Sequence, residues 1–577
     1  MPLQVGCYLT FAEVSGRKCT IEEFRSELRK FGRNGVVFAC SALNCLVANS
    51  FEDQLSTQGR LLAEAFPPTS LGLINQIRAA SSEPRYVFHR RQLLFVAKEA
   101  IRWCSEDGID PRSARFWGGL GLVLLMANDL LDFGLELGIE SEQEIMSTVA
   151  EFIPIAEHAI GTPSLLNSTA RSVLMMGRFV ESLRERKEFI DFAERFRRAT
   201  GMVLADYQAL CIGLISHYMK LDVQAFRSNP GCFLLSRDGW SRNTAVPESI
   251  SDLFLSQISA TPEEISKRLQ QRDYGSSDFT WIRNAPIYAT KDGYFPFDLA
   301  YLSEKLQSGP FWAVHDSMAC QERPKLHAFW GLVFEGYVHW LLSSAVGPKN
   351  LFVASPKFQS TSTEACDAML RCGSSIAVFE FKGSMLTAQA KYSGQPKLLA
   401  SEIDKKLVGS ASEKKGVAQL SHVIRRLFDP KSSLPLEGID LSGIRTIYPV
   451  LVTRDDVGSA VGINLYLNKK FREIFNSRCV RPLRVTPLFC LSVEDLELIS
   501  GYLSEAAFTE ILEARYDNDR SLASTFAAVN NEVMRKIGRR RNKHLEQAFA
   551  AGMDVVCERL FPGRRLDHPY LHLQPGD

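Results

Sequence analysis

The hydrophobic pattern of this 577-residue chain changes in kind near residue 272, and this change limits the folds open to it. From about residue 61 to 225, apolar residues recur with the helical period, and Gly and Pro stand where helices end. After residue 272, short apolar runs alternate with amphipathic stretches, which is typical of strands alternating with helices. The sequence therefore predicts a helical part followed by a mixed α/β part. In the first part we expect helices over 92–103, 120–135, 141–153 and 169–183.

The predicted fold is multidomain, α plus α/β, in four segments. Residues 1–228 form a mostly α-helical N-terminal region, although Val36-Val37-Phe38-Ala39 has the composition of a strand. Residues 229–324 form a linker and a lead-in that holds a β-hairpin around Asp292-Gly293. Residues 325–503 form the α/β domain, and residues 504–577 form a helical, basic C-terminal extension.

Within the α/β domain, the pattern gives a definite order of elements. We expect a helix, three strands, a helix and a strand, followed by a helix, a strand and a helix. The corresponding ranges are 326–342, then 351–358, 365–371 and 376–382, then 417–428, 446–453, 465–475, 485–491 and 493–503.

Composition indicates a soluble, cytoplasmic protein. The 13 cysteines are dispersed without metal-ligand spacing, as expected for reduced thiols. The N-terminus has no secretory pattern, and the longest apolar run, 116–127, is too short to span a bilayer and predicts a buried helix. Because 67 Lys and Arg balance 66 Asp and Glu, a polyanionic partner would have to be held by a local patch.

The most informative residues are Asp367, Glu380 and Lys382. Period two places Glu380 and Lys382 on one face of the third strand. If Gly373-Ser374 is a two-residue turn, Asp367 lies directly opposite Glu380, and opposed residues share a face. Two adjacent carboxylates repel unless a divalent cation lies between them, and oxygen ligands favour Mg²⁺ or Mn²⁺. With Lys382 alongside, these groups suit metal-assisted phosphodiester hydrolysis.

Asp367 followed by Glu380-x-Lys382 on the next strand resembles the PD-(D/E)xK, or restriction-endonuclease-like, nuclease superfamily over residues 325–500. That superfamily shares an α-β-β-β-α-β core, the order predicted here. The resemblance implies that Asp367, Glu380 and the backbone carbonyl of Phe381 hold the metal and that Lys382 positions the attacking water. Cys366 stands where the motif has Pro, a position that varies in the superfamily. An ion pair on the solvent side of a sheet is the alternative interpretation.

Two further catalytic residues are expected from the resemblance. Many members carry a first-helix Glu near the metal, which Glu335 would match, although Glu335 and His339 also suit an exposed pair. Some members use a Gln on the later helix to bind the phosphate backbone, which Gln419 would match, and a solvated helix face is the alternative for its neighbours.

Basic residues concentrate after the Glu380-x-Lys382 strand and near the C-terminus. Residues 391–426 contain eight Lys or Arg and three acids, a net charge of +5, and residues 535–544 contain six basic residues and no acid. We expect phosphate contacts from these segments, with a solvated surface as the alternative. The predicted nucleic-acid-binding residues are Lys405, Lys406, Lys414, Lys415, Arg425, Arg426, Arg539, Arg540 and Arg541.

These patterns lead to one functional hypothesis and one alternative. The hypothesis is a Mg²⁺-dependent endonuclease that cuts nucleic acid, DNA in preference to RNA, while its N-terminal region binds a protein partner or senses a trigger. By analogy with large bacterial proteins of this arrangement, it would act in phage defence or restriction. The alternative is a non-catalytic nucleic-acid-binding or scaffolding protein with a degenerate nuclease domain. No membrane partner is expected, and whether the chain forms a homo-oligomer stays open.

Overall fold

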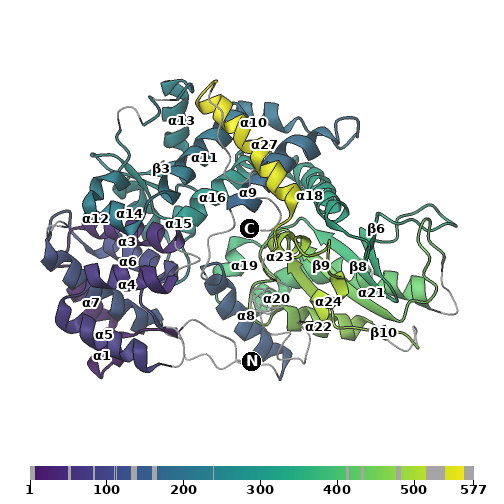
Figure 1. The fold of residues 1–577 in the computed structure, drawn as a ribbon, viewed down its shortest axis with the longest axis horizontal. Helices are drawn as coiled ribbons and strands as arrows, with labels where there is room; N and C mark the ends of the chain where they lie inside the picture. The colour runs from purple at the N-terminus through teal and green to yellow at the C-terminus, as the bar shows by residue number, and fades with distance from the viewer. Residues whose placement is uncertain are drawn as a thin grey trace.

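The computed structural model of the protein describes residues 7–49, 54–81, 85–109, 111, 113–131, 140–158, 165–237, 240–242, 244–410, 415–429, 434–475, 482–514, 538 and 540–563. Helices make up most of these residues, and the largest sheet mixes parallel and antiparallel strands. This is the predicted combination of α and α/β structure. Figure 1 shows the N-terminal helices on one side of the molecule and the main sheet on the other.

The N-terminal region is helical, as expected. Ser141 caps α8 through a capping box with Glu144, and the other predicted helices are also present. Two short strands, β1 (Cys7–Tyr8) and β2 (Arg85–Tyr86), pair in parallel. The helices are α1 (Phe11–Ser15), α2 (Ile21–Leu28), α3 (Arg33–Asn49), α4 (Gln54–Ala65), α5 (Pro68–Ala80), α6 (Arg90–Trp103), α7 (Ala114–Leu131), α8 (Glu142–Ala156), α9 (Leu165–Val173), a π-helix (Leu174–Phe179), α10 (Phe192–Thr200), α11 (Leu204–Met219) and α12 (Val223–Ser228).

The strand expected over 36–39 is wrong, because these residues lie inside α3. Val36, Val37 and Ala39 are fully buried there, and α3 packs against α6. A short apolar run fits a buried strand and a buried helix equally well, and packing decides between them.

The segment 229–324 contains defined elements and a second small sheet. The expected hairpin is confirmed: β4 (Ile287–Ala289) pairs antiparallel with β5 (Tyr294–Pro296) across the Asp292-Gly293 turn, and β3 (Ser259–Ala260) adds a parallel strand. The helices are a 3₁₀ turn (Pro230–Phe233), α13 (Glu248–Ile258), α14 (Pro262–Gln271), α15 (Thr280–Arg283), α16 (Leu299–Gln307) and α17 (Gly309–Ser317).

The α/β segment has the predicted order of elements. It comprises α18 (Arg323–Ala345), β6 (Leu351–Ala354), β7 (Ala368–Cys372), β8 (Ser375–Lys382), α19 (Ala388–Tyr392), α20 (Pro396–Ile403), a π-helix (Asp404–Val408), α21 (Gly416–Phe428), β9 (Thr446–Thr453), α22 (Ile463–Ile474), β10 (Arg484–Val485), β11 (Phe489–Ser492) and α23 (Val493–Ser500). The helices between β8 and α21 were not expected, and the last predicted strand is divided into β10 and β11.

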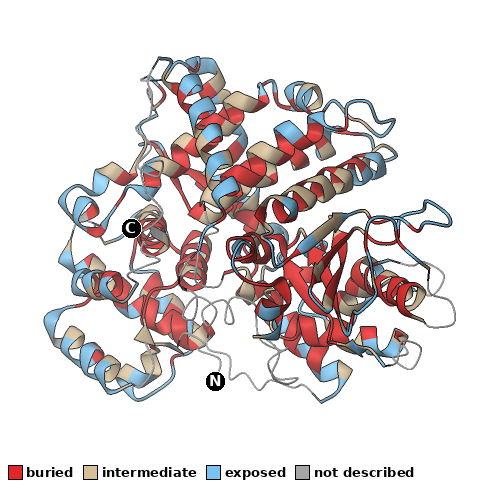
Figure 2. Cartoon of the chain, turned by 45° about the vertical axis from the view of Figure 1, so that its right-hand side comes forward, coloured by how far each residue is buried: buried red, intermediate tan, exposed pale blue. Residues whose placement is uncertain are grey.

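The main sheet has the strand order β10-β9-β8-β7-β6, with β11 also paired to β9. Strands β6, β7 and β8 are antiparallel neighbours, whereas β9 runs parallel to β8. Helix α18 lies on one side of the sheet and helices α21 and α22 lie on the other (Figure 1). Strands β7, β8, β9 and β11 of this sheet are almost entirely buried (Figure 2), whereas β6 and β10 are partly exposed.

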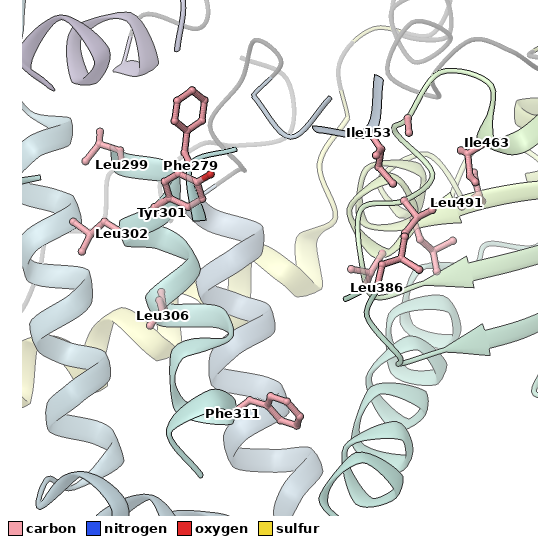
Figure 3. Packing of buried hydrophobic residues seen from close by; sticks show 14 of the residues in the cluster. Ile153, Phe279, Leu299, Tyr301, Leu302, Leu306, Phe311, Leu386, Ile463 and Leu491 are labelled. Atoms are coloured by element: carbon pink, nitrogen blue, oxygen red, sulfur yellow. The ribbon is translucent and has the colours of Figure 1, made fainter. Parts of the chain in front are cut away.

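Elements far apart in the sequence cross between the two halves. Helix α8 packs against α19, α20 and α22, so an N-terminal helix covers part of the α/β segment. Figure 3 shows Ile153 of α8 beside Leu386, Ile463 and Leu491. After α24 (Phe508–Glu513), the C-terminal α27 (Lys543–Leu560) returns to pack against α9 and α11.

Among the described residues, one helix, α7, is long enough and apolar enough to cross a membrane. Helices α10 and α11 would meet the same criteria only if taken together, and the chain bends by 71° between them. Most of α7 is buried inside the protein. The helix is therefore longer than the apolar run 116–127, and its burial is typical of the core helix that the sequence predicts.

Candidate active site

The predicted hairpin register is confirmed. Cys372 pairs with Ser375 and Ala368 with Phe379, so the turn consists of Gly373 and Ser374. Gly373 has a φ of +58°, a left-handed conformation that glycine adopts without strain. Asp367 directly precedes β7, and the same register places it opposite Glu380.

The structure fixes Asp367 from three sides. Its Oδ2 accepts a hydrogen bond from the backbone N–H of Phe381 at 2.5 Å. Its backbone carbonyl accepts hydrogen bonds from the Nε2 of His339 at 2.7 Å and from the N–H of Ser355 at 2.9 Å. Because the N–H and C=O of one strand residue point to the same side, the Phe381 carbonyl also faces Asp367.

Glu380 is buried with one oxygen satisfied and the other not. Its exposed fraction is 2%, and its Oε1 accepts a hydrogen bond from the Nζ of Lys382 at 2.5 Å. Its Oε2 is buried with no hydrogen-bond partner among the described residues. An unsatisfied carboxylate oxygen in the interior is costly, so this atom marks a place where a cation or a proton is favoured.

Burial raises the pKa values of both carboxyl groups. Burial raises the pKa of Glu380 to about 8, with a further increase from the charge of Asp367 and an opposing effect from Lys382. Burial also raises the pKa of Asp367, against the hydrogen bond from Phe381. Carboxyl groups perturbed in this way are typical of functional sites.

Two more carboxyl groups share this environment. Glu335, on α18, accepts a hydrogen bond from the Oγ of Ser355 at 3.4 Å, and burial followed by the charge of Asp367 raises its pKa. Burial raises the pKa of Glu364, with further increases from Glu335 and Asp367. Ser355 contacts two of these residues and has a φ of +42°, an uncommon conformation for a non-glycine residue.

Glu364 was not predicted from the sequence. It lies in the irregular segment between β6 and β7, where it forms an isolated antiparallel bridge with Lys357. Its spacing of three residues from Asp367 does not follow the period of two that places residues on one face of a strand. Its place in the group therefore depends on the path of the loop, and the sequence carries no periodic signal for it.

The donor set suits a hard divalent cation by its chemistry. It offers carboxylate oxygens, the Phe381 carbonyl and the unsatisfied Oε2 of Glu380, and oxygen ligands are those that Mg²⁺ prefers. Across the described part of the chain, however, no group of three or more His, Cys, Asp or Glu side chains has the geometry to hold a metal ion. Asp367 and Glu380 are instead engaged by the Phe381 N–H and by Lys382.

The remaining predicted residues lie in varied surroundings. Gln419 is half-buried on α21, and among the described residues its side chain has no hydrogen bond to Asp367, Glu380 or Lys382. Lys406 pairs with Glu402 at 2.8 Å, and Arg426 lies 4.1 Å above the ring of Phe358.

Several of the predicted basic residues have partners within the protein. Arg425 donates to the Ser421 carbonyl at 3.4 Å. Arg540 pairs with Glu505 at 3.0 Å, and Arg541 lies 3.9 Å from Glu546. Lys405 and Lys415 are exposed, and Lys414 and Arg539 lie outside the described residues.

A comparison of the chain with models of protein families found no match, and neither did comparisons with curated proteins and with solved structures. A functional assignment for this chain therefore depends on its own residues and their geometry.

Proposed function

We propose that the protein is a metal-dependent nuclease with a restriction-endonuclease-like domain over residues 325–503, which cuts phosphodiester bonds of nucleic acid, DNA in preference to RNA. The observation that carries this proposal is the β7–β8 hairpin, which sets Asp367 opposite Glu380 and places Lys382 beside a buried, unsatisfied carboxylate oxygen. The α-β-β-β-α-β order around it supports the same proposal.

Each residue has a role in this proposal. Asp367, Glu380 and the Phe381 carbonyl would hold Mg²⁺ or Mn²⁺, with Glu335 and Glu364 close by. The metal would supply a Lewis acid for the phosphate and lower the pKa of a bound water. Lys382, now bonded to Glu380, would orient the attacking water, and Gln419 would contact the phosphate backbone.

One observation favours the alternative, a nucleic-acid-binding or scaffolding protein with a degenerate nuclease domain. Asp367 and Glu380 already have protein partners, and within the described residues no three-ligand metal geometry exists. These contacts occupy one oxygen of each carboxylate, which suits binding without catalysis, and catalysis would require them to rearrange.

The test is cleavage of supercoiled plasmid and of labelled RNA by the purified chain with Mg²⁺. Asp367→Asn and Lys382→Ala should each lower the rate by about 100-fold or more, because each removes a group that acts on the reacting phosphate or water. Lys349→Ala is the matched control, since Lys349 is exposed and precedes β6 at the opposite end of the sheet. Full cleavage by both site variants would contradict the proposed site, and binding without any cleavage would favour the alternative.

We further propose that the helical N-terminal region binds a protein partner, and that the protein acts in the cytoplasm in phage defence or restriction. Because α27 packs against α9 and α11, the full chain is the appropriate bait for partner capture. A fragment that ends before α27 would expose the apolar surface that this helix covers.

A further inference from the structure

Arg454 lies at the same edge of the sheet as the candidate site. It directly follows β9, whose last residue, Thr453, pairs with Lys382 of β8. Its backbone N–H donates a hydrogen bond to the Lys382 carbonyl at 2.9 Å. Because β8 and β9 are parallel, their carboxyl ends meet at one edge, and Arg454 is adjacent to the proposed catalytic strand.

The Arg454 side chain lies against two aromatic rings. Its guanidinium lies 5.0 Å from the ring centre of Phe311 and 5.4 Å from that of Trp330. It forms no ion pair or side-chain hydrogen bond within the described part of the chain, although it remains partly exposed. Burial lowers its pKa to about 10, the charge of Arg171 adds to this decrease, and the charge of Asp455 opposes it.

The acids near Arg454 are engaged elsewhere. Asp455 lies 3.6 Å from Lys391 and accepts a hydrogen bond from the backbone N–H of Leu386. Glu494 and Glu497 both pair with Arg171. A cation that is partly removed from water and forms no ion pair is costly, so the site is more stable when an anion from outside completes it.

The surroundings of Arg454 continue along α18 to the proposed metal site. His327, Gly331, Glu335 and His339 recur every four residues and lie along one stripe of this helix. The chain leaving β8 crosses this stripe closely, since a Cβ on Gly383 would lie 3.3 Å from the Cα of Gly331. His327 is exposed, and its ring centre lies 5.5 Å from that of Phe311, which packs against Arg454. The pKa of His327 is lowered by partial burial, by His315 and then by Arg454 and Lys406.

We propose that Arg454 binds a phosphate group of the nucleic-acid strand next to the phosphodiester that the candidate site would cut. The rings of Phe311 and Trp330 fix the plane of the guanidinium, which can then donate two parallel hydrogen bonds to phosphate oxygens. Trp330, which contacts Arg454, lies five residues before Glu335 on α18, or about 7.5 Å along the helix, so the subsite is distinct from the cluster of carboxylates. This inference rests on the proposed function.

The experiment measures binding in the absence of cleavage. The metal-free full chain is titrated against fluorescein-labelled single-stranded and duplex DNA and RNA at several salt concentrations, and anisotropy gives the affinity. The variants are Arg454→Gln, Arg454→Met, which keeps contact with the rings, and Arg454→Lys. The control is Arg445→Gln, because Arg445 is exposed and directly precedes β9 at its other end.

Loss of one phosphate contact has a defined signature. Arg454→Gln and Arg454→Met should weaken binding about tenfold at low salt. They should also reduce the slope of log affinity against log salt by about 0.9 for a duplex or about 0.7 for a single strand. Arg454→Lys should keep the slope while losing part of the affinity, and Arg445→Gln should change neither.

Other outcomes overturn the inference. These are unchanged slopes in Arg454→Gln and Arg454→Met, equal losses in Arg445→Gln, no binding of any labelled nucleic acid by the wild type, or binding of inorganic phosphate alone. Plasmid cleavage tests the proposed function separately. If binding depends on Arg454 but no cleavage occurs, the proposed nuclease activity is contradicted and the Arg454 subsite is supported. If the protein cleaves but the Arg454 variants keep the wild-type salt slope, the Arg454 subsite is contradicted and the nuclease activity is supported.

Discussion

At the scale of single residues, Glu380 is held where its charged form is disfavoured. Burial and the charge of Asp367 place its pKa at about 8, against an ordinary value of 4.5. A raised carboxyl pKa contributes stability that is fully present below the ordinary value and is lost as the pH rises through the folded-state value. The metal-free protein should therefore lose stability between these two pH values. Asp367, Glu335 and Glu364 are shifted in the same direction.

Metal binding should show the opposite pH dependence. A bound cation requires deprotonated carboxylates, so Mg²⁺ affinity should rise up to about tenfold per pH unit until about pH 8. We expect a larger increase in melting temperature from Mg²⁺ at about pH 8.5 than at about pH 6.5, measured by thermal denaturation. Glu380→Gln removes the titrating group and should flatten this dependence. Equal shifts at both pH values in the wild type would contradict this prediction.

The sequence predicts the positions of individual site residues best where these depend on a short turn between neighbouring strands. The opposition of Asp367 and Glu380 follows from a two-residue turn, which fixes the register of every pair along the hairpin. Glu364 could not be found in this way, because an irregular loop brings it to Asp367. Arg454 could not be found either, since the contacts that isolate it come from α17 and α18.

At the scale of elements, the start of α21 depends on one glycine. Gly416 has a φ of +50°, and a Cβ there would overlap the backbone carbonyl oxygen of Leu407. Helix α21 packs against β8 and β9 and carries Gln419, so its first residue also positions a predicted site residue.

Gly416→Ala should therefore lower the free energy of unfolding by more than the backbone strain of a positive φ would alone. Gly443 is the matched control, because its φ is +73° and a Cβ at this position would have no neighbouring atom within 4 Å among the described residues. Gly443→Ala should cost about 1 kcal/mol from backbone strain, and Gly416→Ala should cost at least about 2 kcal/mol more, because rigid backbone must move. Urea denaturation measures both values. Equal costs would show that the Leu407 carbonyl moves freely.

The sequence predicted helices and strands correctly where a hydrophobic pattern extended over many residues, and incorrectly where the apolar run was only a few residues long. Helix α18 and strands β7, β8 and β9 have the expected positions, because each buries a continuous apolar face. Val36 to Ala39 satisfied strand propensity but lie in α3, because the surrounding helices bury them. Helices α19 and α20 are short, and packing against α8 accompanies their formation.

At the scale of the whole molecule, a buried polar network joins the N-terminal helices to the candidate domain. Glu157, just after α8, lies 3.7 Å from Lys391 of α19 and also contacts Arg283 and Tyr392. Lys391 also lies 3.6 Å from Asp455, next to Arg454. Lys391 was counted in the basic stretch after β8, yet only 7% of it is exposed. Its charge serves this junction, so the stretch offers less free positive charge than its sequence indicates.

Glu157→Gln should loosen this junction, because it removes a carboxylate that faces two buried cations. Breaking a buried pair costs about 3–5 kcal/mol, and the partial exposure of Glu157 places the expected loss toward the lower end. Hydrogen exchange should accelerate in α19, and the melting temperature should fall. Glu151→Gln is the control, since Glu151 lies on the exposed side of α8. Unchanged exchange in α19 would show that apolar packing alone holds the two halves together.

The sequence by itself determined the class of fold, the order α-β-β-β-α-β and the opposition of Asp367 and Glu380, because periodicity and turn chemistry are local properties. Only the tertiary structure decided which charges are free. It buried Lys391 against Glu157, paired Arg540 with Glu505, brought Glu364 close to Glu335 and Asp367, and left Arg454 without an ion pair among the described residues. The reason is physical: the state of a charge depends on burial and on neighbours from distant segments, which no single stretch of sequence encodes.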